Sequence, residues 1–475
     1  MVPLRHLAAL GLRGVTLMPN ASLRGWFAPI ILGVAVIGLF AAQTYLRSTE
    51  QAPPENREEV VFWHFWGGAD RAIVEEVAQR FNASQSKYFV RPIAMPGNNL
   101  DLKFFLSVTG GDPPDLLNID DPVIADWGHR GAILALDEVA SEEEVARLSS
   151  WLFPAARRLV TYQDRMYGVP NGLDIRALYF NQTMLDRYGL SPPQTIADLD
   201  HIAVTIAPPG QSTPYQQHGF LPDSRRIWAW GPVFGGQFYD AATGQVTLTS
   251  PPIEAALDWM ASYRNRYGPS EIARFRHGDQ SLPGKTFPLF AERYAVVMDG
   301  QWRVRDIRAF QKSQQAKNEP VTQFGVVPLP PPAGGKPNAG WVNGNNFVIP
   351  RGAKSPRGAW EFIKFWCGFD GHETEAARTC VAGGWIPVSP SVVKQPQFAQ
   401  FLQDEPLFQT FIDLAGSENQ YPVPVIPGAP FFNNEVKNVA ESAMASPTKP
   451  NIPQLLEAAQ IRIQSHIDRA GNLSR

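Results

Sequence analysis

Aromatic residues with polar neighbours are the feature of this sequence that is best suited to binding chemistry. The aromatic residues expected in loops or at strand ends are Trp63, Trp66, Trp228, Trp230, Trp302, Trp341, Trp385, Phe431 and Phe432. His64, Asp299 and Asn343 stand beside several of them in the sequence. Flat rings cover the apolar faces of sugars, while Asp and Asn side chains hydrogen-bond hydroxyl groups in defined geometry. The combination favours a site for a neutral carbohydrate, although each ring taken alone is more commonly part of a core.

Asp120 and Asp121 are adjacent acids that could serve as a catalytic carboxylate pair. Neighbouring residues of a strand point to opposite faces, so only a loop could bring both carboxylates to one substrate. The alternative is a turn in which the Asp before Pro122 caps the helix that follows. A glycoside hydrolase therefore stays open as the enzymatic alternative, and an assay for new reducing ends would identify it.

Other catalytic and metal-binding patterns are missing from the sequence. The 8 histidines form no HExxH or other paired spacing, and there is no GxSxG elbow and no Walker-type phosphate loop. Cys367 and Cys380 lack a CxxC spacing. They could pair in an oxidising exterior or pack as small buried side chains, and both alternatives stay open. We therefore expect no enzymatic activity, no metal ion and no cofactor.

Length and composition exclude further classes of protein. A chain of 475 residues exceeds the size at which a single core stops growing, so two or three domains are expected. The hydrophobic fraction of 44% and the charged fraction of 18% are those of a folded globular protein. The 42 Lys and Arg against 45 Asp and Glu give a net charge of −3, too balanced to hold a polyanion, so nucleic acid is excluded as a partner.

Helix and strand patterns alternate in the region that carries the first candidate residues. Strands are expected at residues 60–66, 89–95 and 115–119, and helices at 70–82, 100–108 and 122–130. This order predicts a mainly parallel sheet covered by helices on both faces, with ligands beyond the carboxyl ends of its strands. Trp63, Trp66 and Asp120 lie in or beside those loops. Further helices and strands follow Tyr188, so a second α/β region is interleaved with the first.

Residues 26–46 contain no charged side chain and are long enough to cross a bilayer as a helix. The residues before them carry three arginines and no acid, which places the N-terminus in the cytoplasm. We expect the rest of the chain to be exported and tethered to the cytoplasmic membrane through this helix. A cleaved signal peptide is the alternative. No cysteine lies nearby to carry a lipid.

A block of motifs identifies a family resemblance. Residues 164–181 read DRMYGVPNGLDIRALYFN and are followed by Tyr188-Gly189-Leu190 and a Pro-Pro turn. Residues 111–115 (GDPPD), 290–302 (FAERYAVVMDGQW) and 383–387 (GGWIP) add to it. In order and spacing these motifs resemble the extracellular solute-binding proteins of ABC importers, in particular the family-1 sugar and maltodextrin-type binders. Ile196 stands where this family usually has Trp. This difference does not change the expected fold.

The resemblance implies an α/β, two-lobed periplasmic binding protein fold of type II, the Venus-flytrap fold, preceded by the transmembrane helix. The implied divisions are a cytoplasmic and membrane segment at 1–47, a linker at 48–59, lobe 1 at 60–178 and 335–388, and lobe 2 at 179–334 and 389–475. It also implies a monomer that binds a sugar or oligosaccharide between the lobes, without catalysis, and delivers it to the permease subunits of an ABC importer. The same fold binding a polyamine, glycerol phosphate, peptide or metal, or serving as an anchored sensor ectodomain, is the alternative.

The resemblance also implies the ligand contacts. They are Trp63, His64 and Trp66 after the first strand, Asp120 or Asp121 after the third, Asn171 and Asp174 beyond the YGVP motif, Trp228, Trp230, Asp299, Trp302 and Phe431 from the other lobe, and Trp341, Asn343 and Trp385 near the crossing between lobes. Among these we expect Trp302 to matter most, because its motif places a ring that faces the cleft.

Overall fold

The computed structural model describes residues 54, 56–95, 97, 100–211, 213–282 and 286–472. The expected membrane helix at residues 26–46 lies outside this part of the chain, as does the segment before it. Within the described residues, no helix combines the length and the apolar character needed to cross a bilayer. The chain divides into the compact units Met1–Glu55 and Asn56–Arg475, and the elements below belong to the second unit.

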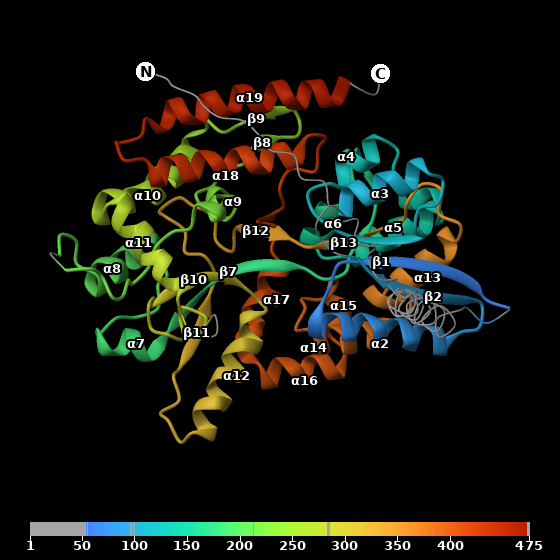
Figure 1. Cartoon of the computed structure of the whole chain (residues 1–475), viewed down its shortest axis with the longest axis horizontal. Helices are drawn as coiled ribbons and strands as arrows, with labels where there is room; N and C mark the ends of the chain where they lie inside the picture. The colour runs from blue at the N-terminus through green and yellow to red at the C-terminus, as the bar shows by residue number, and fades with distance from the viewer. Residues whose placement is uncertain are drawn as a thin grey trace, which may run out of the picture. The chain divides into compact units, whose positions relative to one another are not determined.

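The first sheet, on the right of Figure 1, has the strand order β2-β1-β3-β13-β6. Its strands are β1 (Glu58–His64), β2 (Tyr88–Ala94), β3 (Leu116–Asp120), β6 (Val169–Pro170) and β13 (Asn345–Val348). β1 pairs in parallel with β2 and β3, as the sequence predicts. β13 is antiparallel to β3 and β6. β13 runs in the opposite direction because the chain enters it directly from the second sheet and not through a crossover helix.

Helices cover both faces of the first sheet, as expected. Val60 and Phe62 of β1 face a cluster that includes residues of α2 (Gly68–Ser84) and α13 (Pro356–Cys367). Leu117 and Ile119 of β3 face a different cluster with α3 (Leu100–Thr109) and α4 (Ile124–His129). Successive side chains of a strand point to opposite faces of the sheet, so the strands of this sheet contribute side chains to both clusters. The order β1-α2-β2-α3-β3-α4 confirms the predicted βαβαβα region.

The second sheet has the order β10-β7-β12-β14 and is centred on β7 (Asp174–Asn181), the long strand near the centre of Figure 1. The other strands are β10 (Val296–Gly300), β11 (Phe324–Val327), β12 (Gly340–Asn343) and β14 (Gln420–Tyr421). β7 is antiparallel to β10, β11 and β12. The second sheet is therefore mainly antiparallel, with only β12 and β14 of its described strands paired in parallel.

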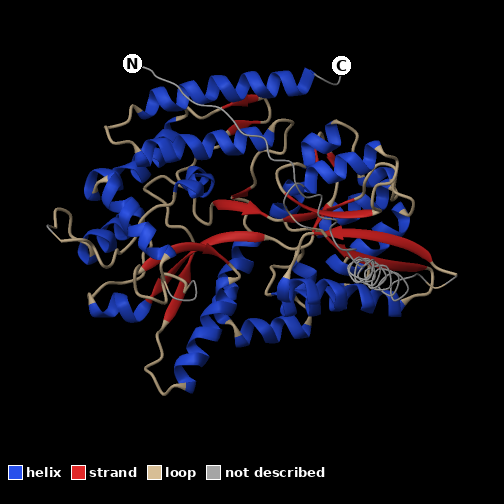
Figure 2. Ribbon diagram, in the orientation of Figure 1, coloured by secondary structure: helices blue, strands red, loops and turns tan. Residues whose placement is uncertain are grey.

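Helices beside the second sheet pack into a cluster of their own (Figure 2). They include α8 (Ile196–Ile206), α9 (Ile227–Val233), α10 (Pro251–Tyr267), α18 (Ala429–Ala445) and α19 (Ile452–Asn472). Leu456 and Ile463 of α19 are buried in this cluster, so one face of the C-terminal helix packs against the other helices. Each such aliphatic side chain contributes about 1.5–3 kcal/mol when fully buried.

The remaining elements connect these layers. They are η1 (Leu136–Glu138), α5 (Glu142–Trp151), α6 (Pro154–Val160), β4 (Thr161–Tyr162), β5 (Arg165–Met166), α7 (Gln182–Arg187), η2 (Ser224–Arg226), β8 (Tyr239–Asp240), β9 (Gln245–Val246), α11 (Pro269–Gln280), α12 (Arg303–Ala316), α14 (Glu373–Gly383), α15 (Pro390–Val393), α16 (Pro396–Asp404), η4 (Pro406–Phe408) and α17 (Gln409–Ala415).

Cys367 ends α13 and Cys380 lies in α14, and both are free, buried thiols. Of the two alternatives left open by the sequence, the disulfide is therefore wrong and the small buried side chains are confirmed. The Cys367 Sγ donates to the carbonyl oxygen of Pro170 at 3.3 Å. Burial raises the pKa of the Cys380 thiol to about 12, so this sulfur stays protonated and unreactive.

The chain passes between the sheets where Gly344 joins β12 to β13 and where residues 171–173 join β6 to β7. A Cβ atom on Gly344 would lie 2.8 Å from the carbonyl oxygen of Gly172, so the crossing segments touch and leave no room for a side chain. The amide of Asp121 also donates to the Gly344 carbonyl oxygen at 3.2 Å.

We expect Gly344→Ala to destabilise the fold by about 1–3 kcal/mol, because the added methyl must push apart backbone segments that both carry sheet pairing. Urea unfolding measures the change. Gly189→Ala is not a suitable control because Gly189 has a positive φ of 65°. Gly67→Ala serves instead, since nothing lies within 4 Å of its added Cβ. Equal midpoints for Gly344→Ala and the wild type would contradict close packing at the crossing.

Candidate binding cleft

A cavity of about 290 Å³ lies beside the crossing and is lined from both sheets. From the side of the first sheet come Trp66, Asp70 and Trp385, and the segment entering β7 supplies Asn171 and Asp174. From the side of the second sheet come Gln301, Trp302, Arg305 and Asp306. Residues distant in the sequence are therefore gathered around one small polar and aromatic space.

A stack of indole rings forms the first-sheet wall of this cavity. Trp66 lies 5.9 Å from the ring centroid of Trp366 at an interplanar angle of 8°, and 6.0 Å from Trp385 at 25°. Trp366 is buried beneath, and its Nε1 donates to the Asn171 carbonyl oxygen at 3.2 Å. The buried ring fixes the orientation of the two rings that line the cavity. The wall is thus a rigid aromatic platform.

Trp302 stands on the second-sheet side of the cavity and covers a buried arginine. The guanidinium carbon of Arg176 lies 4.7 Å from the Trp302 ring and 5.2 Å from the Trp341 ring. Arg176 is 5% exposed, and burial lowers the pKa of its guanidinium to about 10, so it stays charged at neutral pH. Cation–π contacts on both sides hold this charge beneath the cleft.

Carboxyl groups line the same end of the sheets. The Gln301 Nε2 donates to the Asp174 Oδ1 at 2.7 Å, and burial raises the pKa of Asp174 against the opposing charge of Arg176. The Gly344 amide donates to the Asp121 Oδ1 at 3.3 Å. Burial is the main cause that raises the pKa of Asp121 to about 7. Lost hydration and the charge of Asp174 raise the pKa of Asp120 to about 6.

The turn interpretation of Asp121 is wrong in one respect, because its side chain does not cap the next helix. The N-cap of α4 is Val123, without a side-chain cap bond. Asp121 instead bonds the crossing residue Gly344 through both its amide and its carboxyl group. Asp120 ends β3 and is more exposed than Asp121, so the adjacent acids have different surroundings.

Asp299 and Asn343 lie close to this region, but they differ in whether a side-chain oxygen is available to a ligand. The Asp299 carboxylate accepts from the Gly300 amide at 2.9 Å and from the Arg303 Nε at 2.7 Å, so its oxygens are already used. Asn343 pairs with Asp174 across β12 and β7. Within the described residues, its buried Oδ1 has no hydrogen-bond partner.

Other candidate residues are not brought to the cavity. Trp228 and Trp230 are buried in the cluster around α9, whose residues are buried on all sides. Phe431 stacks on His466 at a centroid distance of 4.2 Å. Trp63 packs on the opposite face of the first sheet from Trp66.

His64 is 1% exposed and lies 5.9 Å from the ring of Trp66, which it supports from behind. Burial is the main cause that lowers the pKa of His64 to about 4, so its imidazole is neutral at physiological pH. Its place in the structure is that of a neutral packing residue.

Sequence reasoning missed Arg176, Asp70, Arg305 and Asp306. Arg176 follows Asp174 by two residues on β7, and that spacing puts both on one face of the strand, which was a usable signal. Asp70 was assigned only to the start of a helix, where it does lie. Its Oδ1 is also 3.9 Å from the Arg305 Nη1 across the cavity, a pairing that no local pattern reveals.

A second contact joins the sides at another place. The amide of Gly428, which precedes α18, donates to the Asp126 Oδ1 of α4 at 2.6 Å. In Figure 1, α4 lies above the first sheet and α18 above the second. A carboxylate at a helix N-terminus also meets the positive end of the helix dipole. Asp126 therefore ties α18 to the first-sheet side.

We expect Asp126→Ala to remove about 1 kcal/mol from this contact and to let the sides separate, because Gly428 loses a charge-assisted acceptor. Small-angle X-ray scattering on the unliganded chain measures this as a larger radius of gyration. The same substitution at the exposed Asp258 is the matched control and should change nothing. An unchanged radius in Asp126→Ala would show that the contact does not hold the sides together.

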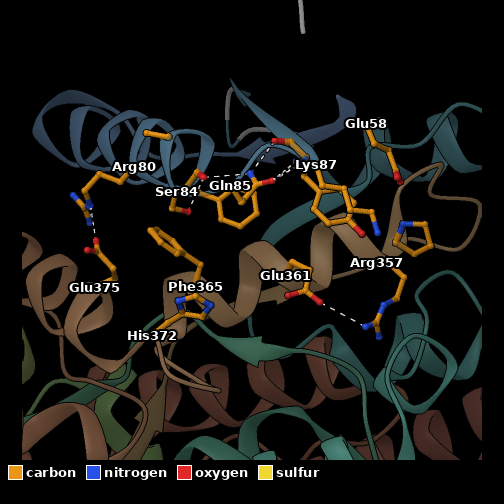
Figure 3. Close-up of a pocket in the computed structure, with 14 residues that line it drawn as sticks. Glu58, Arg80, Ser84, Gln85, Lys87, Arg357, Glu361, Phe365, His372 and Glu375 are labelled. Atoms are coloured by element: carbon orange, nitrogen blue, oxygen red, sulfur yellow. Dashed lines mark hydrogen bonds and ion pairs between the residues drawn. The ribbon is translucent and has the colours of Figure 1, made fainter. Parts of the chain in front are cut away.

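A larger cavity, of about 990 Å³, lies elsewhere, between α2 and α13 (Figure 3). Its charged side chains turn toward one another: the Arg80 Nε lies 2.9 Å from Glu375, and the Arg357 Nη2 lies 3.5 Å from Glu361. Lys87 is near the rim. Because these groups satisfy each other, the smaller cavity at the crossing is the better candidate site.

Comparisons with known proteins identify the family and the fold. Residues 67–367 match the model of the family described as bacterial extracellular solute-binding protein. The structure of CpMnBP1 with mannotriose bound is 25% identical, with a TM-score of 0.68 over 85% of this chain and 99% of that chain. The cyclic α-maltosyl-1,6-maltose binding protein of Arthrobacter globiformis is 18% identical, with a TM-score of 0.68 over 87% of this chain and 100% of that one.

A similar sequence is the maltooligosaccharide ABC transporter solute-binding lipoprotein of Streptococcus pneumoniae, 22% identical over 303 residues. The match covers 62% of this chain and 65% of that lipoprotein, slightly less than two thirds of its length.

Proposed function

Because the chain belongs to the family of bacterial extracellular solute-binding proteins, we propose that the cavity at its crossing captures an oligosaccharide for an ABC importer. Members of this family bind solutes, so the chain is a binding protein and not an enzyme. The observation that carries the proposal is the pairing of Trp66 and Trp385 on one wall with Trp302 on the other, around polar groups of Asn171 and Asp174.

The chemistry of these walls suits a sugar. Indole faces cover the C–H faces of a pyranose, and the carboxyl and amide groups between them bond its hydroxyl groups. A cavity of about 290 Å³ holds a short sugar segment, and longer oligosaccharides would extend out of it. Micromolar affinity, about −8 kcal/mol, needs only a few such buried rings after the cost of ordering is subtracted.

Capture would involve closure of the lobes about the crossing segments. The sequence-based division, with lobe 1 at 60–178 and 335–388 and lobe 2 at 179–334 and 389–475, is part of this proposal. The Asp70 to Arg305 ion pair and the Asp126 to Gly428 hydrogen bond support it, since each joins opposite sides of the cleft. A ligand that contacts both walls favours the closed arrangement by its differential affinity.

Export and membrane attachment complete the proposal. The S. pneumoniae relative is a lipoprotein of an ABC transporter. In this chain we propose that residues 26–46 provide the attachment, since no cysteine precedes Cys367. The tether would keep a monomeric binding protein close to its permease subunits.

Isothermal titration calorimetry of the chain with maltotriose, mannotriose and spermidine tests the function. We expect one of the sugars to bind with a Kd of about 1–10 µM and spermidine not to bind. Binding of spermidine alone would favour the alternative of a polyamine binder. An assay for new reducing ends on the same sugars should stay blank.

A further inference from the structure

A second cavity, of about 370 Å³, lies at the β14 edge of the second sheet and is called here the β14-edge cavity. The proposed sugar site adjoins β7 and the segment after β10, whereas this cavity adjoins Tyr421 of β14. Its walls come from both sides of the crossing. Arg158 and Thr161 extend from α6 and β4, and Trp228 and Phe238 belong to the second-sheet cluster.

The lining of the β14-edge cavity is mostly carbon. It includes the rings of Trp228, Phe238, Tyr239 and Tyr421. Trp228 and Phe238 pack together at a centroid distance of 4.3 Å, which holds both rings in place. Aromatic faces and edges in such an arrangement favour a planar ring as the ligand.

Two of the polar side chains that line it, Arg158 and Thr161, are already engaged. The Arg158 Nη1 donates to the carbonyl oxygens of Glu418 at 2.8 Å and Gln420 at 3.1 Å, and its guanidinium carbon lies 5.3 Å from the Tyr421 ring. The Thr161 Oγ1 donates to the Arg157 carbonyl oxygen at 2.8 Å. A sugar carries several hydroxyl groups that each need a partner, and a mostly apolar lining offers few, so this cavity suits a sugar poorly.

A buried polar group of the wall is not satisfied. Trp228 is 2% exposed, and within the described residues its Nε1 has no hydrogen-bond partner. A buried N–H without an acceptor is unfavourable, and a ligand that reaches the indole edge with one acceptor removes that penalty.

We propose that the β14-edge cavity is a second binding site, for a small planar ring compound that carries a single hydrogen-bond acceptor. This site is spatially separate from the proposed sugar site, because the residues that line the two cavities do not overlap. An occupant would touch segments from both sides of the crossing at once, and therefore stabilise the arrangement in which those segments meet.

Nuclear magnetic resonance of the ¹⁵N-labelled full chain tests the proposal, with coumarin and benzamide as probes. The Trp228 indole signal is identified by its absence in Trp228→Phe. We expect that signal to shift and saturate with a Kd of about 1 mM for at least one probe, and not to shift with glucose. Nuclear Overhauser effects from the probe to the rings of Trp228 and Tyr421 confirm the location without any variant.

Adjacent alanines offer a matched pair of variants. Ala241 lines the cavity and Ala242 does not, and both are exposed, so a tryptophan at either position leaves the core intact. We expect Ala241→Trp to weaken the probe at least tenfold and Ala242→Trp to leave it unchanged. A saturating probe should also raise the melting temperature by about 2 °C in the wild type and in Ala242→Trp only.

Three results would overturn the proposal. They are the absence of a saturable Trp228 shift with either probe at about 10 mM, equal binding by Ala241→Trp and Ala242→Trp, and a glucose shift at the same signal. If Ala241→Trp proves unfolded by its melting curve, the probe contacts to Trp228 and Tyr421 in the wild type decide alone.

Discussion

Replacing Trp302 with alanine weakens oligosaccharide binding by at least about tenfold, and by up to about a hundredfold. Its ring lines the cavity opposite Trp66 and Trp385, so the substitution removes one of the faces that enclose the sugar. An aromatic contact of this kind contributes roughly 1.5–3 kcal/mol, and each 1.4 kcal/mol is a factor of ten. Calorimetry with the sugar that binds the wild type most tightly measures the loss.

Two controls separate binding from folding. Trp302→Phe keeps a ring and should recover part of the affinity. Trp63→Ala removes an indole from the opposite face of the first sheet, so the affinity should stay within about twofold of the wild type. A fall of more than about 5 °C in the melting temperature of Trp302→Ala would mark Trp302 as a structural residue that covers Arg176, and would remove it from the site.

The substitution Asp121→Asn should remove part of the pH dependence of the free energy of unfolding. Burial raises the pKa of Asp121 to about 7, above the value near 3.9 of an unfolded chain. The folded state therefore binds a proton that the unfolded state has released between these values. The contribution of this group is full below about pH 4 and is lost as the pH rises through about 7. We expect the wild type to lose about 2 kcal/mol from it between pH 5 and pH 8.

Urea unfolding of the sugar-free chain at pH 5 and pH 8 measures this difference. The amide in Asp121→Asn does not titrate, so the variant should lose about 2 kcal/mol less than the wild type over the same interval. Asp258→Asn changes an exposed carboxyl and should behave as the wild type does. Asp120 and Asp174 of the surrounding electrostatic network are present in both proteins, and Arg176 stays charged over this interval, so the comparison isolates the change at Asp121. Equal differences in Asp121→Asn and the wild type would show that the Asp121 carboxyl is hydrated.

The first sheet could be predicted from the sequence because its signals are local. Short apolar runs ended by glycine, and helices with apolar residues at three- and four-residue spacing, gave β1 to α4 in the right order. The second sheet could not be predicted in this way. Its central strand β7 pairs with β10, β11 and β12, which come from distant parts of the chain, and their antiparallel directions depend on tertiary contacts.

The sequence predicted those site residues that lie in loops or at strand ends. It missed the residues whose place in the site depends on tertiary packing. Trp66, Trp302 and Trp385 follow strands or precede turns, and the structure brings them together. Trp228 and Trp230 have similar neighbours in the sequence, but every residue of their helix, α9, is buried. They therefore do not reach this cavity. Arg176 looked like an ordinary strand residue because its neighbours Trp302 and Trp341 are more than a hundred residues away.

A crystal structure of the chain with its tightest-binding sugar tests the central claim most directly. The account predicts a pyranose ring held between the indoles of Trp66 or Trp385 and that of Trp302, with a hydroxyl group bonded to Asp174 or Asn171. A sugar seated elsewhere while this cavity holds only water would contradict it.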